Sequence, residues 1–218
     1  MKKILFLFLA ACFFFSCEKE TIVIPQQHAG RTVLAFFWAD NSLNSSLRNN
    51  IQTMMQGLQA MKDSAALLVY WDGEASDISW PEPCIVEYVT NGQGGINSLS
   101  KGTIDAMMAD KNTSIYDLIG IGNIRKKYPP QTSTEKTVMQ TVIGDMMSAY
   151  PSESYGIIFG SHGSGWLPTI TGTRSIGQDG GRYSSDTALI PELAEVLRTV
   201  NPGQRIFLVG KLSFKRIA

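Results

Sequence analysis

The residues of this chain best suited to chemistry lie around His162, one of only two histidines. The apolar run 155–159 (YGIIF) predicts a buried strand, which Gly160 bounds. Open α/β sheets bind ligands at the carboxyl ends of their strands, which is where this histidine would lie. Its neighbour Gly163 lets a backbone approach a substrate closely, and the Gly163 amide could donate to an oxyanion. A histidine placed in this way predicts acid–base catalysis, provided that a nucleophile lies within hydrogen-bond reach.

No nucleophile with a supporting motif accompanies the histidine. The three cysteines are Cys12, Cys17 and Cys84. Cys84 begins a predicted strand upstream of His162, and we interpret it as a small buried hydrophobe. Ser213 has no motif around it, and the G-x-S-x-G elbow of α/β-hydrolases is absent. An α/β-hydrolase with His162-Gly-Ser-Gly as an oxyanion loop is therefore the weakest of the functions that we considered.

Apolar runs alternate with helical patterns along the chain, which favours βαβ units and a parallel sheet. The segment 115–121 fits either a helix or a strand. A loop rich in glycine and threonine is expected over 166–183. The expected strands are 31–38, 65–71, 84–90, 155–159 and 205–209, and the expected helices are 43–61, 133–150 and 191–200.

Several of these segments together resemble one family. The segment 155–166 (YGIIFGSHGSGW) is similar to the histidine motif of the clostripain-like cysteine peptidases. The segment 32–43 (TVLAFFWADNSL) resembles their opening strand and turn, and 175–179 and 189–197 resemble the linker and helix before their nucleophile. The resemblance covers most of the chain from Arg31 to Val209. It implies an α/β fold, a caspase-like three-layer sandwich with a mostly parallel sheet.

The resemblance also implies roles for individual residues. His162 would be the acid and base, and Gly163 would supply the oxyanion amide. An endopeptidase of this kind cleaves after Arg or Lys, and the aspartate of its Asp-Ala-Cys segment helps to bind that side chain. From their own positions, Asp40 and Asp179 are candidate substrate-binding residues, and Asp179 could instead be a solvated loop residue. Asp40 could equally cap the following helix, and Asn41 or Ser42 could also cap it. Members of the family often cut themselves between histidine and cysteine, where Arg174 and Arg182 lie. Some members need calcium; no other cofactor and no metal ligands are expected.

The sequence departs from the family after Gly210. The family's next strand ends in Asp-Ala-Cys, whereas this chain continues as 211–218 (KLSFKRIA). From this difference we expect a frameshift or truncation near Gly210, with the C-terminal part of the fold missing. Loss of the nucleophile costs about a million-fold in turnover, so the chain is expected to be inactive as given.

The amino terminus predicts export. Residues 1–16 have a basic start and a short apolar core typical of a signal peptide, and Ser16-Cys17 resembles a lipoprotein processing site. Acylation of Cys17 would anchor the protein to a membrane. An ordinary secretory signal is the alternative. Residues 17–30 form a tether, 31–210 form the peptidase-like domain, and 211–218 form a tail outside the family pattern.

Composition narrows the class of partner. The formal net charge is zero and no basic stripe is present, so no nucleic acid partner is expected. No cysteine pair has zinc spacing. We expect a protein of the bacterial cell envelope, facing the periplasm or the exterior, with peptides or proteins as substrates. The alternative from another class is a surface lipoprotein that binds peptides or a partner without cutting.

Overall fold

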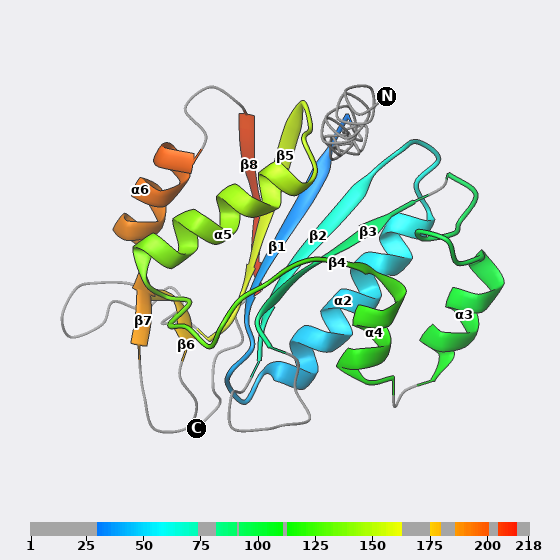
Figure 1. Cartoon of the computed structure of the whole chain (residues 1–218), viewed down its shortest axis with the longest axis horizontal. Coiled ribbons are helices and arrows are strands. Elements are labelled where there is room, and N and C mark those ends of the chain that lie inside the picture. Colours follow the sequence, from blue (N-terminus) through cyan, green and yellow to red (C-terminus); the bar gives the residue numbers. More distant parts are fainter. Residues whose placement is uncertain are drawn as a thin grey trace, which may run out of the picture.

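The computed structural model describes residues 30–73, 82–90, 92–110, 113–162, 175–179, 186–200 and 205–212, and for residues 179, 186–187 and 205–212 it describes the backbone only. Strands and helices alternate along most of this length (Figure 1). The strands are β1 (Thr32–Trp38), β2 (Ala66–Asp72), β3 (Cys84–Val89), β4 (Asn123–Lys127), β5 (Ser154–Gly160), β6 (Ser175–Asp179), β7 (Asp186–Leu189) and β8 (Arg205–Leu212). The helices are α2 (Asn44–Gln59), α3 (Lys101–Ala109), α4 (Ile115–Ile121), α5 (Lys136–Ala149) and α6 (Ile190–Val200).

The main sheet has six strands in the order β4-β3-β2-β1-β5-β8. β1 pairs in parallel with both β2 and β5, and β5 pairs in parallel with β8. β3 is antiparallel to both of its neighbours, so it alone runs against the other strands of this sheet. The predicted mostly parallel sheet is confirmed. β6 and β7 form a separate antiparallel pair.

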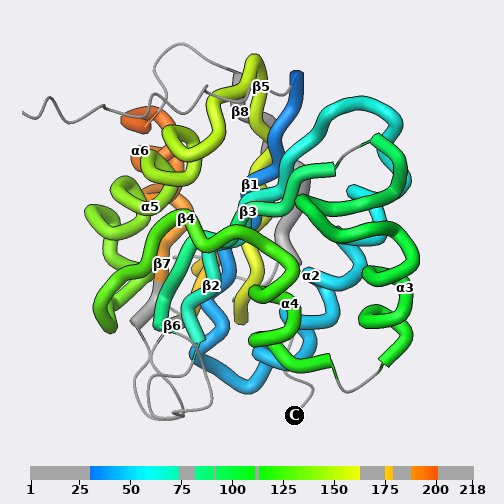
Figure 2. Tube along the Cα trace, turned by 45° about the vertical axis from the view of Figure 1, so that its right-hand side comes forward, coloured from blue at the N-terminus to red at the C-terminus, as the bar shows by residue number. Residues whose placement is uncertain are grey.

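Helices cover both faces of the sheet, which gives the predicted three-layer sandwich. α5 and α6 lie on one side, and α2, α3 and α4 lie on the other (Figures 1 and 2). The side chains of β1 alternate between the two cores, as the pleat of a strand requires. Leu34, Phe36 and Trp38 pack toward α5 and α6. Ala35 and Phe37 pack toward the other three helices.

Most predicted elements are present, with ends displaced by a few residues. The ambiguous segment is helix α4, which Ser114 and Asp117 begin with a capping box. Helix α5 begins at Lys136 rather than at Ser133 or Thr134. Both of these residues are buried, and Ser133 instead bonds to neighbouring strands.

Several expectations were wrong. The apolar pattern did not predict the predominantly polar β4, nor β6 and β7, and β6 lies within the segment 166–183 that was expected to be a loop. The last strand was expected to stop at Val209, but β8 continues through Lys211 and Leu212 because backbone pairing with β5 continues to Gly160. The helix over 101–109 was also missed, since it buries only Ile104 among its residues.

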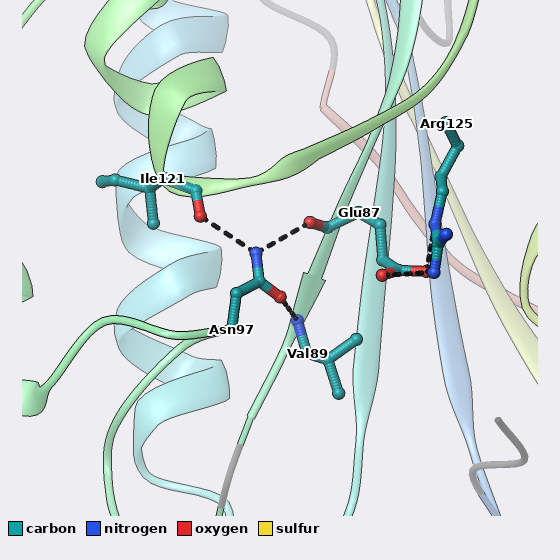
Figure 3. Close-up of polar contacts among 5 residues, drawn as sticks. All are labelled: Glu87, Val89, Asn97, Ile121 and Arg125. Atoms are coloured by element: carbon teal, nitrogen blue, oxygen red, sulfur yellow. Dashed lines mark hydrogen bonds and ion pairs between the residues drawn. The ribbon is translucent and has the colours of Figure 1, made fainter.

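A nearly buried ion pair fastens β4 to β3. Glu87 is 1% exposed, and both of its carboxylate oxygens accept hydrogen bonds at 2.8 Å from Arg125, one from Nε and one from Nη2 (Figure 3). On the adjoining loop, the Asn97 amide donates to the Glu87 and Ile121 carbonyl oxygens and accepts from the Val89 amide. Polar contacts therefore hold this strand at the edge of the sheet.

Removal of Arg125 should lower the stability of the fold, because it leaves the buried Glu87 carboxylate without its ion-pair partner. We expect Arg125→Ala to lower the free energy of unfolding by about 3 kcal/mol, measured by urea denaturation. Lys127→Ala is the matched control on the same strand, since its ion pair with Glu82 is exposed on both sides. The control should stay within about 0.5 kcal/mol of the parent. Equal losses in the two variants would contradict the role of the buried pair.

β5 approaches β1 and α2 closely at Gly160. A Cβ atom there would lie 2.6 Å from Phe37 Cδ1 and 2.7 Å from Leu47 Cδ2. We expect Gly160→Ala to destabilise the fold by about 1–3 kcal/mol, because both neighbours are fully buried. Gly57→Ala in α2 is the control: its Cβ would meet nothing within 4 Å, and helix propensity predicts a gain of about 0.5–1 kcal/mol. Thermal unfolding of both variants should show shifts of opposite sign; a neutral Gly160→Ala would refute the close approach.

Candidate active site

The carboxyl ends of β1 and β5 lie side by side and bring two chain segments together. Phe37 pairs with Gly160 at the end of the shared register. Beyond these strands, the Oγ of Ser42 and the Nε2 of His162 lie 3.0 Å apart, a hydrogen-bond distance. His162 is half-buried, and Ser42 is exposed. The structure thus places the predicted acid–base histidine at the predicted edge and gives it a partner that the sequence did not indicate.

A polar clamp, formed by Asn41, Ser161 and Gln178, fixes the two loops. Ser161 is fully buried; its Oγ donates to the Gln178 carbonyl at 2.9 Å and accepts from the Gln178 amide at 3.0 Å. The Asn41 Nδ2 donates to the Ser161 Oγ at 3.4 Å and to the Gln178 carbonyl at 3.3 Å. The clamp therefore joins the loops after β1 and β5 to strand β6.

Asn41 also shapes the turn that carries Ser42. Its Oδ1 accepts from the Leu43 amide at 2.9 Å, which is an Asx turn, and its Nδ2 donates to the Trp38 carbonyl at 2.7 Å. The sequence predicted that Asn41 or Ser42 caps the helix. The residue before α2 is instead Leu43, with no side-chain capping bond. Asn41 bonds just ahead of the helix, and Ser42 turns to His162.

A buried polar network lies next to the same edge of the sheet. The Trp38 Nε1 donates to the Ser133 carbonyl at 2.8 Å, and the Ser133 Oγ lies 2.6 Å from the Tyr70 hydroxyl. Ser133 also donates to the carboxylate of Asp72, which is 4% exposed. Gly177 lies against the Trp38 indole, where a Cβ would come within 2.8 Å. The network ties the last residues of β1 and β2 to the segment before α5, and sequence reasoning missed it.

The two candidate substrate carboxylates belong to this edge of the sheet. Asp40 directly follows the buried Ala39 at the end of β1 and is half-buried. Asp179 is the last residue of β6 and directly follows Gln178, whose carbonyl accepts from Asn41. The backbones of both residues therefore lie next to the clamp.

Cys84 lies at the same edge but far from the histidine along it. It begins β3, opposite Trp71 of β2, and β2 and β1 separate it from β5. Three strand spacings correspond to about 14 Å. The side chain is 1% exposed, and burial raises the pKa of the thiol to about 11. These facts agree with the interpretation of Cys84 as a buried core residue, because a nucleophilic thiol needs a lowered pKa and access.

Several predicted residues lie outside the described part of the chain: Cys17, Gly163, Arg174, Arg182 and Ser213. Among the described residues, no three histidine, cysteine, aspartate or glutamate side chains gather as a metal site would require, so we derive no step through calcium. No helix in the described ranges is both long enough and apolar enough to cross a membrane.

The raised pKa of Cys84 predicts a pH dependence of stability. The unfolded thiol ionises near pH 9, and the folded thiol near pH 11. The contribution of this thiol is therefore complete below pH 9 and is lost as the pH rises toward 11, by about 2 kcal/mol. Urea unfolding at pH 8 to 11 should show a steeper fall for the parent than for Cys84→Ala, which removes this titration and keeps that of the tyrosines. Parallel curves would contradict the burial of the thiol.

Comparison with known proteins gives matches to one family of peptidases. The model of the clostripain family matches residues 35–210. A secreted C11 cysteine protease from Bacteroides thetaiotaomicron, solved with an irreversible peptide inhibitor, is 26% identical; the match covers 84% of this chain and 42% of that one, with a TM-score of 0.55. A cysteine protease from B. fragilis is also 26% identical, over 65% of this chain and 96% of that one, with a TM-score of 0.45.

No curated protein matches the sequence. The chain spans less than half the length of the B. thetaiotaomicron protease. The family match nevertheless takes in β2 to β7, His162 and most of β1 and β8. This chain therefore belongs to the clostripain family of cysteine peptidases.

Proposed function

We propose that this chain carries the histidine part of a cysteine endopeptidase site, with His162 as the acid and base. The observation that carries the proposal is the position of His162 at the carboxyl edge of the sheet, between β1 and β8, in contact with Ser42. In such a site the imidazole takes the thiol proton, the thiolate attacks the peptide carbonyl, and the imidazolium then protonates the leaving amine.

The topology supports a nucleophile delivered by β8. This strand pairs with β5 up to Gly160 and Leu212, so its carboxyl end and that of β5 lie next to each other. No cysteine follows Cys84 in the sequence, and Cys84 is buried too far away. We therefore propose activity for a chain in which a cysteine follows β8, and none for the sequence as printed.

We extend the proposal to specificity and location. The family resemblance supports cleavage after Arg or Lys, and Asp40 and Asp179 lie at the edge where a basic side chain would bind. One similar protease is described as secreted, which supports a location outside the cytoplasm. Acylation at Cys17 would anchor the protein there.

A non-catalytic binding protein is the second candidate. It is favoured by one observation: among the described residues the single cysteine is Cys84, which is buried. The edge could still bind an extended peptide, because peptide binding needs neither a nucleophile nor a base.

The first experiment reads the gene beyond the Gly210 codon in all three frames. A segment encoding Asp-Ala-Cys in any frame supports the peptidase, and the corrected chain is then assayed on peptides with Arg, Lys or Ala before the cut. We expect cleavage after Arg or Lys. His162→Ala should reduce turnover by about 10⁴-fold or more, and His28→Ala, at the only other histidine, should not change it.

Two results would overturn the proposal. The first is cysteine-dependent cleavage by the printed chain, which would mean that a nucleophile exists without the proposed segment. The second is full activity of His162→Ala in the corrected chain. If no frame encodes such a segment, binding without cleavage is the better account.

A further inference from the structure

We infer that Ser42 is a positioning residue for His162: its hydroxyl holds the imidazole with the proton on Nε2, which leaves Nδ1 as the nitrogen that accepts a proton. The inference rests on the proposed function, because the proton is assigned to Nε2 so that Nδ1 can act as the base. The contact itself, 3.0 Å between Ser42 Oγ and His162 Nε2, is a property of this chain.

The order of the strands places the Ser42 contact with Nε2 on the β1 side of His162. β5 lies between β1 and β8, and Ser42 belongs to the loop after β1. With Nε2 occupied on the β1 side, Nδ1 is the nitrogen left for a nucleophile from β8. A neutral imidazole has one donor and one acceptor nitrogen, and the bond at one nitrogen sets the role of the other. Ser42 must therefore accept from Nε2–H if Nδ1 is to act as a base.

The surroundings of Ser42 do not indicate a role in stabilising the fold. Within the described part of the chain, the hydrogen bond of its hydroxyl goes to His162. It does not cap α2, since the residue before that helix is Leu43 and has no side-chain capping bond. The side chain is exposed, so it adds little to the core. A stabilising role in the fold is thus a poor explanation for this contact.

Neighbouring residues hold Ser42 in place beforehand. Asn41 fixes the turn on the amino side through Trp38 and Leu43, and α2 begins two residues beyond Ser42. Across the contact, Ser161 anchors the residue before His162 through its two bonds to Gln178. Because both loops are fixed by buried or half-buried groups, little conformational entropy remains to be lost when the hydroxyl meets the ring.

The test measures the tautomer of His162 in the intact chain. Histidine is labelled with ¹⁵N, and the two ring-nitrogen shifts are recorded at a pH where the imidazoles are neutral. We expect a proton-bearing Nε2 and a bare Nδ1, with a wider separation of shifts than in the urea-unfolded chain, where the tautomers exchange freely. Ser42→Ala should move the separation toward the unfolded value, whereas Ser42→Thr, which keeps the hydroxyl, should retain it.

Ser45→Ala is the matched control, since Ser45 is also exposed and lies in the first turn of α2. It should leave the spectrum of His162 unchanged. The inference is overturned if Ser42→Ala keeps the parent separation, or if the parent carries its proton on Nδ1. Thermal unfolding of each variant confirms that it is folded. The measurement needs no peptidase activity, so its outcome is independent of whether the chain cleaves peptides.

Discussion

The double pairing of β1 is the constraint on which the rest of this structure depends. β1 pairs in parallel with β2 on one edge and with β5 on the other, so none of its backbone is left at a sheet edge. Helices cover both of its faces, and every residue of the strand except Val33 is buried. After an enclosed strand the chain can turn only beyond the strand's carboxyl end. The first polar side chains after β1, Asp40 to Ser42, therefore lie at the carboxyl edge of the sheet.

Burial and hydrogen bonding fix the loop that follows β1. Ser161 is fully buried and would be costly to leave unpaired, and the carbonyl and amide of Gln178 satisfy it. Asn41 then bonds to the same pair from the β1 side. Trp38 is the last residue of β1. Its Nε1 donates to the Ser133 carbonyl, and Gly177 lies against its indole ring. The contact between Ser42 and His162 thus lies at the surface, next to polar contacts that are buried.

The sequence predicted what depends on local pattern, and it missed what depends on contacts between distant segments. Runs such as 32–38 are apolar throughout, so a central strand was predictable, and the glycine-bounded run before His162 placed the histidine at the correct edge. The helix over 115–121 was ambiguous because its seven residues are too few for a clear period; Ser114 and Asp117 were the signal that could have decided it. Ser42 was considered only as a helix cap. Its contact with His162 joins residues 120 positions apart, which no local pattern encodes.

The hydrogen bonds of the clamp join residues that precede β7, and the strands that carry these residues pair with later ones: Gln178 with Thr187 of β7, and β5 with β8. β8 joins the sheet by backbone pairing with β5, which almost any non-proline sequence can supply. This backbone pairing therefore does not specify which side chain follows β8, whereas the proposed chemistry requires a cysteine there. Fold stability and the proposed nucleophilic catalysis therefore depend on different residues of this edge.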